Sequence, residues 1–443
     1  MRTLLLLAVL AGPTAATANP IDSFGLGSRG ASMSGAMAAV ATDFAANYYN
    51  PAGLARGRDL TLSFGYVWAD PDLTMNGEDA GVDSAHGIVF GAAAPGVAAG
   101  IPFAFGIGLY LPDDRVSRVR SLPQRTPRWE LYDNRIQRLY LAANVAIEPV
   151  PGFSMGGGLA FMSATNGTLD VQGVVTYPDP AQSDLRHRVD ADLSSVRYPQ
   201  VGLRWAPTKW LEVGLVYRGE FQLDLHLDAV LSGDLVAFDA YTIENARVAL
   251  ESTSVNAFLP QQVVLGVALR PGPFLIAIDL TWIDWSAYRS PTSKVDYSMD
   301  IPIPPDLQGS VTIPQAPPGV RPLDPDFRDR VVPRLGAEWS RDLSSSFRLA
   351  ARAGWAFEAT PVPDQPGETN FVDSDRHVLT AGIGLELGIL RAILPKPVRV
   401  DVHGQLFVFD EREIEKESPA DAVGDYRADG TITAAGATLG AQF

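Results

Sequence analysis

The chain has 443 residues, of which 46% are hydrophobic and only 19% are charged, and its formal net charge at pH 7 is −16. A nucleic-acid-binding protein needs a basic face, so this charge balance argues against that class. The sequence contains 0 cysteines, which excludes disulfides, thiolate nucleophiles and cysteine-ligated metals. Glycine (41 residues) and proline (34 residues) are abundant, as in proteins built from many strands joined by turns.

The N-terminus has the three parts of a secretory signal peptide. Arg2 supplies positive charge, residues 4–11 are apolar, and the small residues Ala16-Thr17-Ala18 form a cleavage site. The apolar run is too short for a transmembrane helix. We therefore predict a signal peptide over residues 1–18 and a mature chain that begins at Asn19. No cysteine follows the cleavage site, so a lipoprotein anchor is excluded.

The next stretch, from Gly25 to Leu54, is rich in glycine, alanine and serine and has few large aliphatic residues. It ends in the turn-forming sequence Asn50-Pro51-Ala52-Gly53, in which proline fixes φ and asparagine favours a cap or a turn. Such a segment has too little apolar surface to build a core of its own. We predict that residues 19–57 form a plug inside a structure built by the rest of the chain.

After the plug the dominant sequence pattern has period two, as expected for strands with two unlike faces. In residues 347–358, for example, Leu349 and Trp355 alternate with Arg348 and Arg352. We find about fourteen such segments, an even number as in outer-membrane barrels. They centre on residues 60–68, 86–94, 103–111, 137–147, 153–165, 196–205, 210–222, 261–270, 274–285, 334–341, 347–358, 377–387, 398–409 and 431–443.

Short and long connections alternate between these segments. The long ones cover residues 113–135, 170–195, 224–246, 289–332 and 411–429. Outer-membrane barrels have short periplasmic turns and long extracellular loops, and only a closed barrel satisfies the backbone of membrane-spanning strands. We therefore predict an all-β fold, a transmembrane antiparallel β-barrel of about fourteen strands over residues 58–443 in the outer membrane of a Gram-negative bacterium.

Several motifs resemble those of a known family. They are Gly25-Leu26-Gly27-Ser28-Arg29-Gly30, Ser34-Gly35-Ala36, Ala41-Thr42-Asp43, Tyr49-Asn50-Pro51-Ala52-Gly53-Leu54, Leu259-Pro260, Asp279-Leu280-Thr281-Trp282 and 375–384. In them the chain resembles the FadL/TodX-type transporters, which take up long-chain fatty acids and other hydrophobic compounds. The resemblance implies that the plug is an N-terminal hatch in the barrel lumen. It also implies extracellular capture, an internal apolar pocket, and passive lateral release through a gap beside a kinked third strand.

The hatch supplies the first set of candidate site residues. The candidates for gating are Asn50, Pro51, Ala52, Gly53, Asp43 and Gly30. Small residues allow a folded segment to pack inside a barrel, so the sequence is compatible both with a gate and with a purely structural plug.

The third predicted strand supplies the candidates for the lateral gap, which are Phe103, Phe105, Gly106 and Gly108. Glycine within a strand indicates a bulge or the close approach of another segment. The two glycines therefore either open the wall or make room for side chains of the hatch.

An apolar cluster lies in the predicted loop 224–246, at Leu231, Leu235, Val236 and Phe238. Exposed apolar clusters usually mark binding sites, so we expect extracellular capture of substrate here. The alternative is that the loop packs on itself.

Five arginines fall on predicted lumen faces, Arg218, Arg270, Arg348, Arg352 and Arg399, and the last four are the candidates for contact with a substrate carboxylate. Arginine makes bidentate contacts with carboxylates, so these residues are candidates for binding a fatty-acid head group. The alternative is an ion-pair network with acidic residues such as Asp401 and the hatch residue Asp43.

Enzyme motifs are missing: the 5 histidines are dispersed, without H-E-x-x-H, and there is no G-x-S-x-G. The match Gly25-x-Gly27-x-x-Gly30 to a dinucleotide fingerprint follows a signal peptide and not a strand, so we reject it. We predict a monomeric, non-enzymatic transporter without cofactor or metal. Its expected partners are a hydrophobic small molecule, outer-membrane lipid and lipopolysaccharide, and the barrel-assembly machinery. The last of these is expected because the terminal residue Phe443 resembles the C-terminal aromatic signal for outer-membrane assembly. The alternatives are a diffusion pore for small polar solutes, an outer-membrane lipid hydrolase or a non-transporting surface barrel.

Overall fold

The structure is a computed structural model that describes residues 20–114, 125–133, 138–177, 184–237, 241–290, 294–303, 305, 319–388, 394 and 396–443. The predicted signal peptide lies outside the described residues. Within them the helices are α1 (Pro20–Phe24), α2 (Ser28–Ala31), α3 (Ala46–Tyr49) and α4 (Glu130–Asp133), with 3-10 turns η2 (Pro51–Arg56) and η4 (Trp285–Ala287). None of these described helices is long and apolar enough to cross a membrane.

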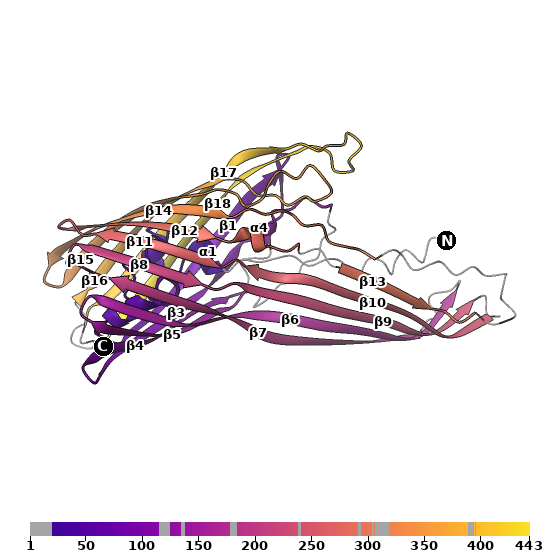
Figure 1. Ribbon diagram of the computed structural model, residues 1–443, viewed down its shortest axis with the longest axis horizontal. Coiled ribbons are helices and arrows are strands. Elements are labelled where there is room, and N and C mark those ends of the chain that lie inside the picture. The colour runs from indigo at the N-terminus through magenta and orange to yellow at the C-terminus, as the bar shows by residue number, and fades with distance from the viewer. Residues whose placement is uncertain are drawn as a thin grey trace.

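Fourteen antiparallel strands close into a barrel (Figure 1). In ring order they are β1 (Thr61–Met75), β3 (Ala85–Ala98), β4 (Ile101–Pro112), β5 (Tyr140–Val150), β6 (Phe153–Tyr177), β7 (Asp184–Trp205), β8 (Leu211–Arg218), β11 (Gln262–Leu269), β12 (Phe274–Ile283), β14 (Arg330–Ser344), β15 (Phe347–Glu358), β16 (Arg376–Leu387), β17 (Val398–Ile414) and β18 (Tyr426–Gln442). Pairing of β1 with β18, from Thr61 with Gln442 to Met75 with Ala428, closes the ring. The short β2 (Glu78–Asp79) pairs with the end of β1. The predicted barrel and its strand number are confirmed.

The two faces of the wall differ in the way that the period-two pattern predicts. On β1 the outward side chains of Phe64 and Trp68 are 54% and 40% exposed, whereas Val67 and Ala69 between them are buried. An outward apolar surface matches a hydrocarbon environment, because lipid replaces water around the wall of a membrane barrel.

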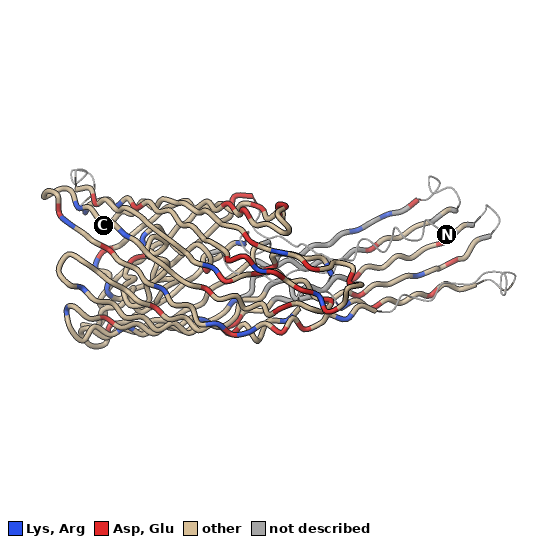
Figure 2. Tube along the Cα trace, turned by 90° about the horizontal axis from the view of Figure 1, so that it is seen from above, with Lys and Arg blue, Asp and Glu red and all other residues tan. Residues whose placement is uncertain are grey.

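Beyond one end of the barrel, five strands continue as a projecting sheet that we call the arm (Figure 1). It consists of the distal parts of β6 and β7 together with β9 (Phe221–Ala237), β10 (Tyr241–Leu259) and β13 (Lys294–Asp300). β6 leaves its barrel neighbour β5 at Met162 but stays paired with β7 to residue 174. Figure 2 shows many acidic and basic residues at the barrel rim from which the arm projects.

The arm corrects part of the sequence interpretation, because the predicted loops 170–195 and 224–246 are largely strands. Their aspartates and arginines suggested loops, yet these charged residues alternate with apolar ones. Asp170 pairs with Arg188 on one face of the sheet, and the neighbouring Val171 lies on the other. Outside the membrane, charge on one face of a strand costs little because that face meets water.

Residues 20–57 lie inside the ring, because they bond to strands around its whole circumference. The Ser28 N–H donates to Thr438 on β18 (3.0 Å), and the Ser34 N–H donates to Thr380 on β16 (3.1 Å). On the opposite wall, the Met37 N–H donates to Asp279 on β12 (2.9 Å). These long-range bonds satisfy hatch groups that have no sheet or long helix of their own.

Candidate functional site

A belt of glycines on the inner face of the wall brings the strands close to the hatch main chain. A Cβ atom on Gly156 of β6 would lie 2.6 Å from the carbonyl carbon of Pro51, and one on Gly354 of β15 would lie 2.5 Å from that of Met33. Both separations are far below van der Waals contact, so only glycine fits. Gly214, Gly266 and Gly336 also approach the hatch main chain, whereas Gly91, Gly106, Gly202 and Gly382 make room for hatch side chains.

The hatch motif Asn50-Pro51-Ala52-Gly53 ties the hatch to itself and to the wall. The buried Asn50 amide donates to the carbonyls of Ala38 (2.6 Å) and Leu203 (3.0 Å), and its oxygen accepts from the Ala52 N–H (3.1 Å). Pro51 occupies the first position of η2, and a Cβ on Gly53 would lie 3.0 Å from the carbonyl carbon of Ala41. This geometry describes an anchor, and a role in gating stays a prediction.

The other two hatch candidates have local structural contacts. Gly30 packs against the ring of Tyr49, whose Cζ would lie 2.6 Å from an added Cβ, and the Tyr49 hydroxyl accepts from the Leu26 N–H (3.2 Å). The Asp43 carboxylate accepts from the Ala45 N–H (3.0 Å) in the turn before α3. Each contact fixes a bend in the hatch chain.

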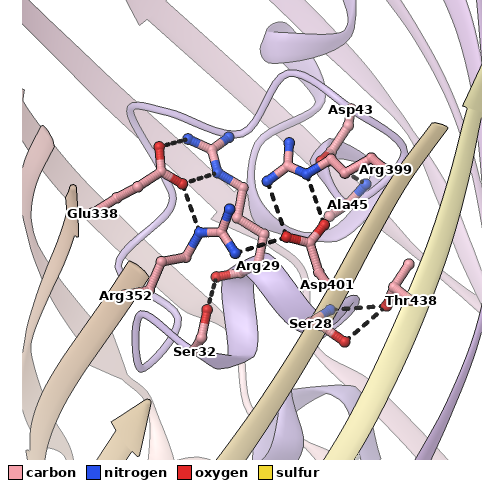
Figure 3. Close-up of polar contacts among 10 residues, drawn as sticks. All are labelled: Ser28, Arg29, Ser32, Asp43, Ala45, Glu338, Arg352, Arg399, Asp401 and Thr438. Carbon is pink, nitrogen blue, oxygen red and sulfur yellow. Dashed lines mark hydrogen bonds and ion pairs between the residues drawn. The ribbon is translucent and has the colours of Figure 1, made fainter. Parts of the chain in front are cut away.

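A chain of five alternating charges joins the hatch to the wall (Figure 3). Arg29 of the hatch contacts Glu338 on β14 (3.0 Å), which also accepts from Arg352 on β15 (2.6 Å). Arg352 reaches Asp401 on β17 (2.7 Å), which accepts in turn from Arg399 (2.7 Å). Two arginines predicted to bind a substrate carboxylate are therefore bound by carboxylates of the protein, as in the ion-pair alternative.

The remaining two carboxylate-binding candidates also lie away from the barrel centre. Arg270 contacts Glu212 (3.2 Å), which pairs with Arg204 (2.5 Å). Arg348 donates to Ser340 (2.9 Å) beside the short turn between β14 and β15 and is half-exposed. Neither residue reaches the cavity described next.

A cavity of about 70 Å³ lies between the hatch and the half of the wall nearer the arm. Hatch residues 21–25, 31, 34–35 and 48–49 form one side of it, and residues of β8, β10, β11, β12, β14, β15, β16 and β17 form the other. Its apolar lining includes Phe24, Leu259, Ile283, Trp285 and Phe407. Its charged lining consists of Asp22, Arg218, Asp279, Arg330, Arg334, Glu358 and Arg376.

The four cavity arginines have unequal partners. Glu358 is shared by Arg334 (2.7 Å), Arg330 (3.8 Å) and the directly adjacent Arg376. Arg218 instead donates to the neutral oxygen of Gln262 (3.1 Å), and its guanidinium lies 4.4 Å from the ring centre of Tyr48. Four guanidinium groups thus face three carboxylates in a small, partly open space, which gives the cavity a net positive charge.

The lateral-gap candidates lie on β4, whose ladders are continuous. β4 pairs with β3 from Ile101 to Pro112 and with β5 from Phe103 to Tyr110 without a register shift. A Cβ on Gly106 would lie 2.7 Å from the Leu54 side chain of the hatch, so this glycine makes room for the hatch, the second of the two expectations. Gly108 faces Asn47 and Leu26 of the hatch, and Phe105 points outward, packed edge-on against Phe103.

The capture candidates fall on the arm instead of on a loop. Leu231 and Val236 are half-buried on β9 and, being an odd number of residues apart, lie on opposite faces of the sheet. Leu235 belongs to the same strand, and Phe238 lies outside the described residues. The predicted single cluster is therefore divided between two faces.

Sequence analysis missed three of the cavity arginines, Arg330, Arg334 and Arg376. A signal was present, because Arg330 and Arg334 are four residues apart on one face of β14 and Arg376 begins β16. Arginines at matching ends of two strands converge only when the ring closes, and the register that closes it is not visible in a single strand.

Comparisons with known proteins agree with this architecture. The family model described as "Outer membrane protein transport protein (OMPP1/FadL/TodX)" matches residues 7–443. Alkane uptake protein A of Marinobacter nauticus is 30% identical over 197 residues, which is 44% of this chain and 37% of that protein. The match therefore spans well under half the length of this relative.

Solved structures share the fold at low sequence identity. A Pseudomonas aeruginosa FadL homologue has a TM-score of 0.56 at 15% identity, with 97% of this chain and 98% of that chain covered. The P. putida toluene transporter TodX has a TM-score of 0.54 at 14% identity, with 95% and 99% covered. The chain therefore belongs to the OMPP1/FadL/TodX family of outer-membrane transport proteins and is a β-barrel of the Gram-negative outer membrane.

Proposed function

We propose that this protein carries hydrophobic small molecules passively across the outer membrane, with long-chain fatty acids as its preferred substrates. The single observation that carries the proposal is the cavity above the hatch, in which an apolar wall of Phe24, Leu259 and Ile283 meets a surplus of arginine. A fatty acid has the matching parts, an alkyl chain and one carboxylate.

Arg218 is the residue to which we assign the substrate carboxylate. It donates to the neutral Gln262 and to the Tyr48 carbonyl (3.4 Å) and lies over the Tyr48 ring, with Asp22 as the carboxylate that attracts it, whereas Arg330, Arg334 and Arg376 share Glu358. A guanidinium group offers paired donors to a carboxylate, and the pair gains strength where water is excluded. Alkane and toluene, the molecules named for two similar proteins, lack this charge and serve as comparison substrates.

We place extracellular capture on one face of the arm. Leu231 of β9, Leu250 of β10 and Tyr297 of β13 share this face, because Leu231 pairs with Val248, Leu250 pairs with Tyr297, and alternate residues of a strand point the same way. The opposite face carries charged residues such as Glu251 and Asp296, which pair with each other across β10 and β13. A fatty acid in water would bind to the apolar face.

We place the exit beside β4, where the continuous ladder has to part from a neighbouring strand. Gly106 and Gly108 carry no side chains to hold this part of the wall against the hatch, so Asn47 and Leu54 of the hatch fill the space. Withdrawal of these hatch side chains would leave an opening at membrane depth. An apolar molecule that leaves there enters lipid without crossing an aqueous passage.

The test compares the uptake of two substrates by a Gram-negative strain that lacks its own fatty-acid transporter and expresses this protein. We expect the chain to restore uptake of labelled oleate, and we expect Arg218→Gln to reduce oleate uptake about tenfold while hexadecane uptake changes less than about twofold. The control is Arg348→Gln, which alters a half-exposed arginine at a short turn. Equal loss of both substrates in Arg218→Gln would show that this arginine does not bind the carboxylate.

A further inference from the structure

Eight aromatic side chains form a layer across the extracellular mouth of the barrel, and we call this layer the aromatic roof. All eight are buried, with exposed fractions of 6% or less. Phe258 belongs to β10 and Phe409 to β17, while Phe327 and Phe371 lie in the segments before β14 and β16. The others lie in or next to the short helices: Trp129 and Tyr132 at α4, and Trp285 and Tyr288 at η4.

The rings form two groups in contact, one of Phe258, Trp285, Tyr288, Phe327 and Phe371 and the other of Trp129, Tyr132 and Phe409. Phe258 contacts Tyr288 edge to face (centroids 5.6 Å apart), and Tyr288 stacks on Phe327 (4.3 Å, interplanar angle 9°). Phe327 in turn meets Phe371 edge to face (5.8 Å). The backbone of Phe371 forms a bridge with Arg128, which precedes Trp129, so the backbone links the first group to the second.

The roof lies directly above the cavity. Trp285 belongs to both, and the guanidinium of Arg330, a cavity residue, lies 5.4 Å from its ring centre. Arg376 also belongs to the cavity and packs against Tyr132 and Phe409 of the roof. Phe258, next to the cavity residue Leu259, is the point at which the arm meets the roof. The path from the arm along β10 to the cavity therefore runs past these rings.

The stacked pair in the first group is held by irregular backbone. Residues 321–329, which contain Phe327, form no helix or strand, and Tyr288 directly follows η4. The Arg328 N–H donates to the Pro361 carbonyl (2.9 Å), the Ser286 N–H donates to the Asp329 carboxylate (2.9 Å), and Arg289 pairs with Asp324 (3.8 Å), so contacts outside the barrel ladder hold this segment. Separation of Tyr288 from Phe327 thus breaks no bond of the barrel ladder.

We propose that the aromatic roof selects substrates by width and that Tyr288 and Phe327 are its specificity-determining pair. The pair parts to admit an extended alkyl chain or a single flat ring and excludes wider molecules. The inference rests on the proposed function, because it names the residues that limit which hydrophobic molecules reach the cavity.

The first experiment compares oleate with a fatty acid that carries pyrene at the end of its chain. In Phe327→Ala we expect the ratio of pyrene-acid uptake to oleate uptake to rise at least about tenfold, since specificity for shape follows the loss of pocket contacts. The control is Leu323→Ala, which removes an exposed apolar side chain (44%) from the same irregular segment and should leave the ratio unchanged. An unchanged ratio in Phe327→Ala, or an equal fall for both substrates, would overturn the proposal.

The second experiment locks the pair and does not depend on the stability of Phe327→Ala. Because the chain has 0 cysteines, Tyr288→Cys with Phe327→Cys supplies two unique thiols for a short bifunctional thiol reagent. Cross-linking should stop oleate uptake, and each single-cysteine variant treated in the same way should retain it. Uptake by the cross-linked protein at the rate of the untreated double variant would contradict the proposal. Failure of the unaltered chain to take up oleate would instead contradict the proposed function itself.

Discussion

A glycine on the inner face of a barrel strand makes room for the hatch, whereas a glycine in a turn allows an unusual backbone conformation. At Gly156 and Gly354 the hatch main chain occupies the space of the missing side chain. Sequence analysis singled out Gly106 and Gly108 but not the belt, because the inward direction of a glycine becomes meaningful only when the hatch is in place. The anchor residue Asn50, by contrast, stands in a motif that was visible from the sequence.

A single substitution tests this belt. A Cβ on Gly214 of β8 would lie 2.5 Å from the Ala38 carbonyl carbon, so Gly214→Val forces the hatch away from the wall. We expect a loss of about 1–3 kcal/mol, as for other overpacked sites, and a lower temperature of heat-induced unfolding in detergent. The control is Gly404→Val on the lipid-facing side of β17, where the nearest atom is 4.0 Å away. Equal unfolding temperatures for the two variants would show that the belt is not needed.

Charged side chains hold neighbouring elements together. From the sequence, such a side chain could be assigned to one face of a strand but not to a partner. Period-two alternation predicted that Arg352 and Arg399 point inward, and they do. Arg352 pairs with Glu338 on another strand, and Glu338 also binds Arg29 of the hatch, more than three hundred residues away in sequence. The same alternation on β6 and β9 was taken for loop because charge marked one face, and only the cross-strand register reveals the arm.

Glu338→Gln tests whether the ion chain holds the hatch on β14 and β15. The substitution leaves Arg29 without its paired carboxylate and Arg352 with Asp401 alone at a largely buried site, which costs on the order of 3 kcal/mol. We expect protease cleavage within the hatch to become faster in the intact barrel. Glu411→Gln removes a comparable charge from an exposed pair with Arg427 and should not alter cleavage. Resistance of both variants to cleavage would argue against an anchoring role.

The capture proposal predicts an effect that depends on substrate concentration. Leu231→Asp with Leu250→Asp places charge on the apolar face of the arm, so oleate uptake should fall several-fold at low substrate concentration and recover at high concentration. The matched control, Asp228→Asn with Glu251→Gln, alters the opposite face. Uptake curves that coincide for both variants would place capture elsewhere.

At the scale of the whole molecule, the hatch distinguishes a hydrophobic-compound transporter from an open porin. The barrel, its strand number and its family were predictable, since they follow from a repeated pattern and from short motifs. The cavity was not, because its lining joins the hatch to eight strands that are distant in sequence.

Deletion of residues 19–52 tests the hatch as a plug. The strands make their ladder bonds without it, so we expect a folded barrel with a water-filled lumen that conducts ions steadily in planar bilayers. The full chain should show no such steady conductance. If the shortened chain fails to assemble in the outer membrane, the hatch is needed first for folding.

The central claim is that this hatch-filled barrel transports apolar molecules and does not let small polar solutes through. The most direct measurement follows labelled oleate and a labelled disaccharide entering the same cells, with and without the protein. The account predicts that oleate uptake rises about tenfold while disaccharide entry stays at the level of the empty control. A rise in disaccharide entry without a rise in oleate uptake would contradict it and would identify the protein as a diffusion pore.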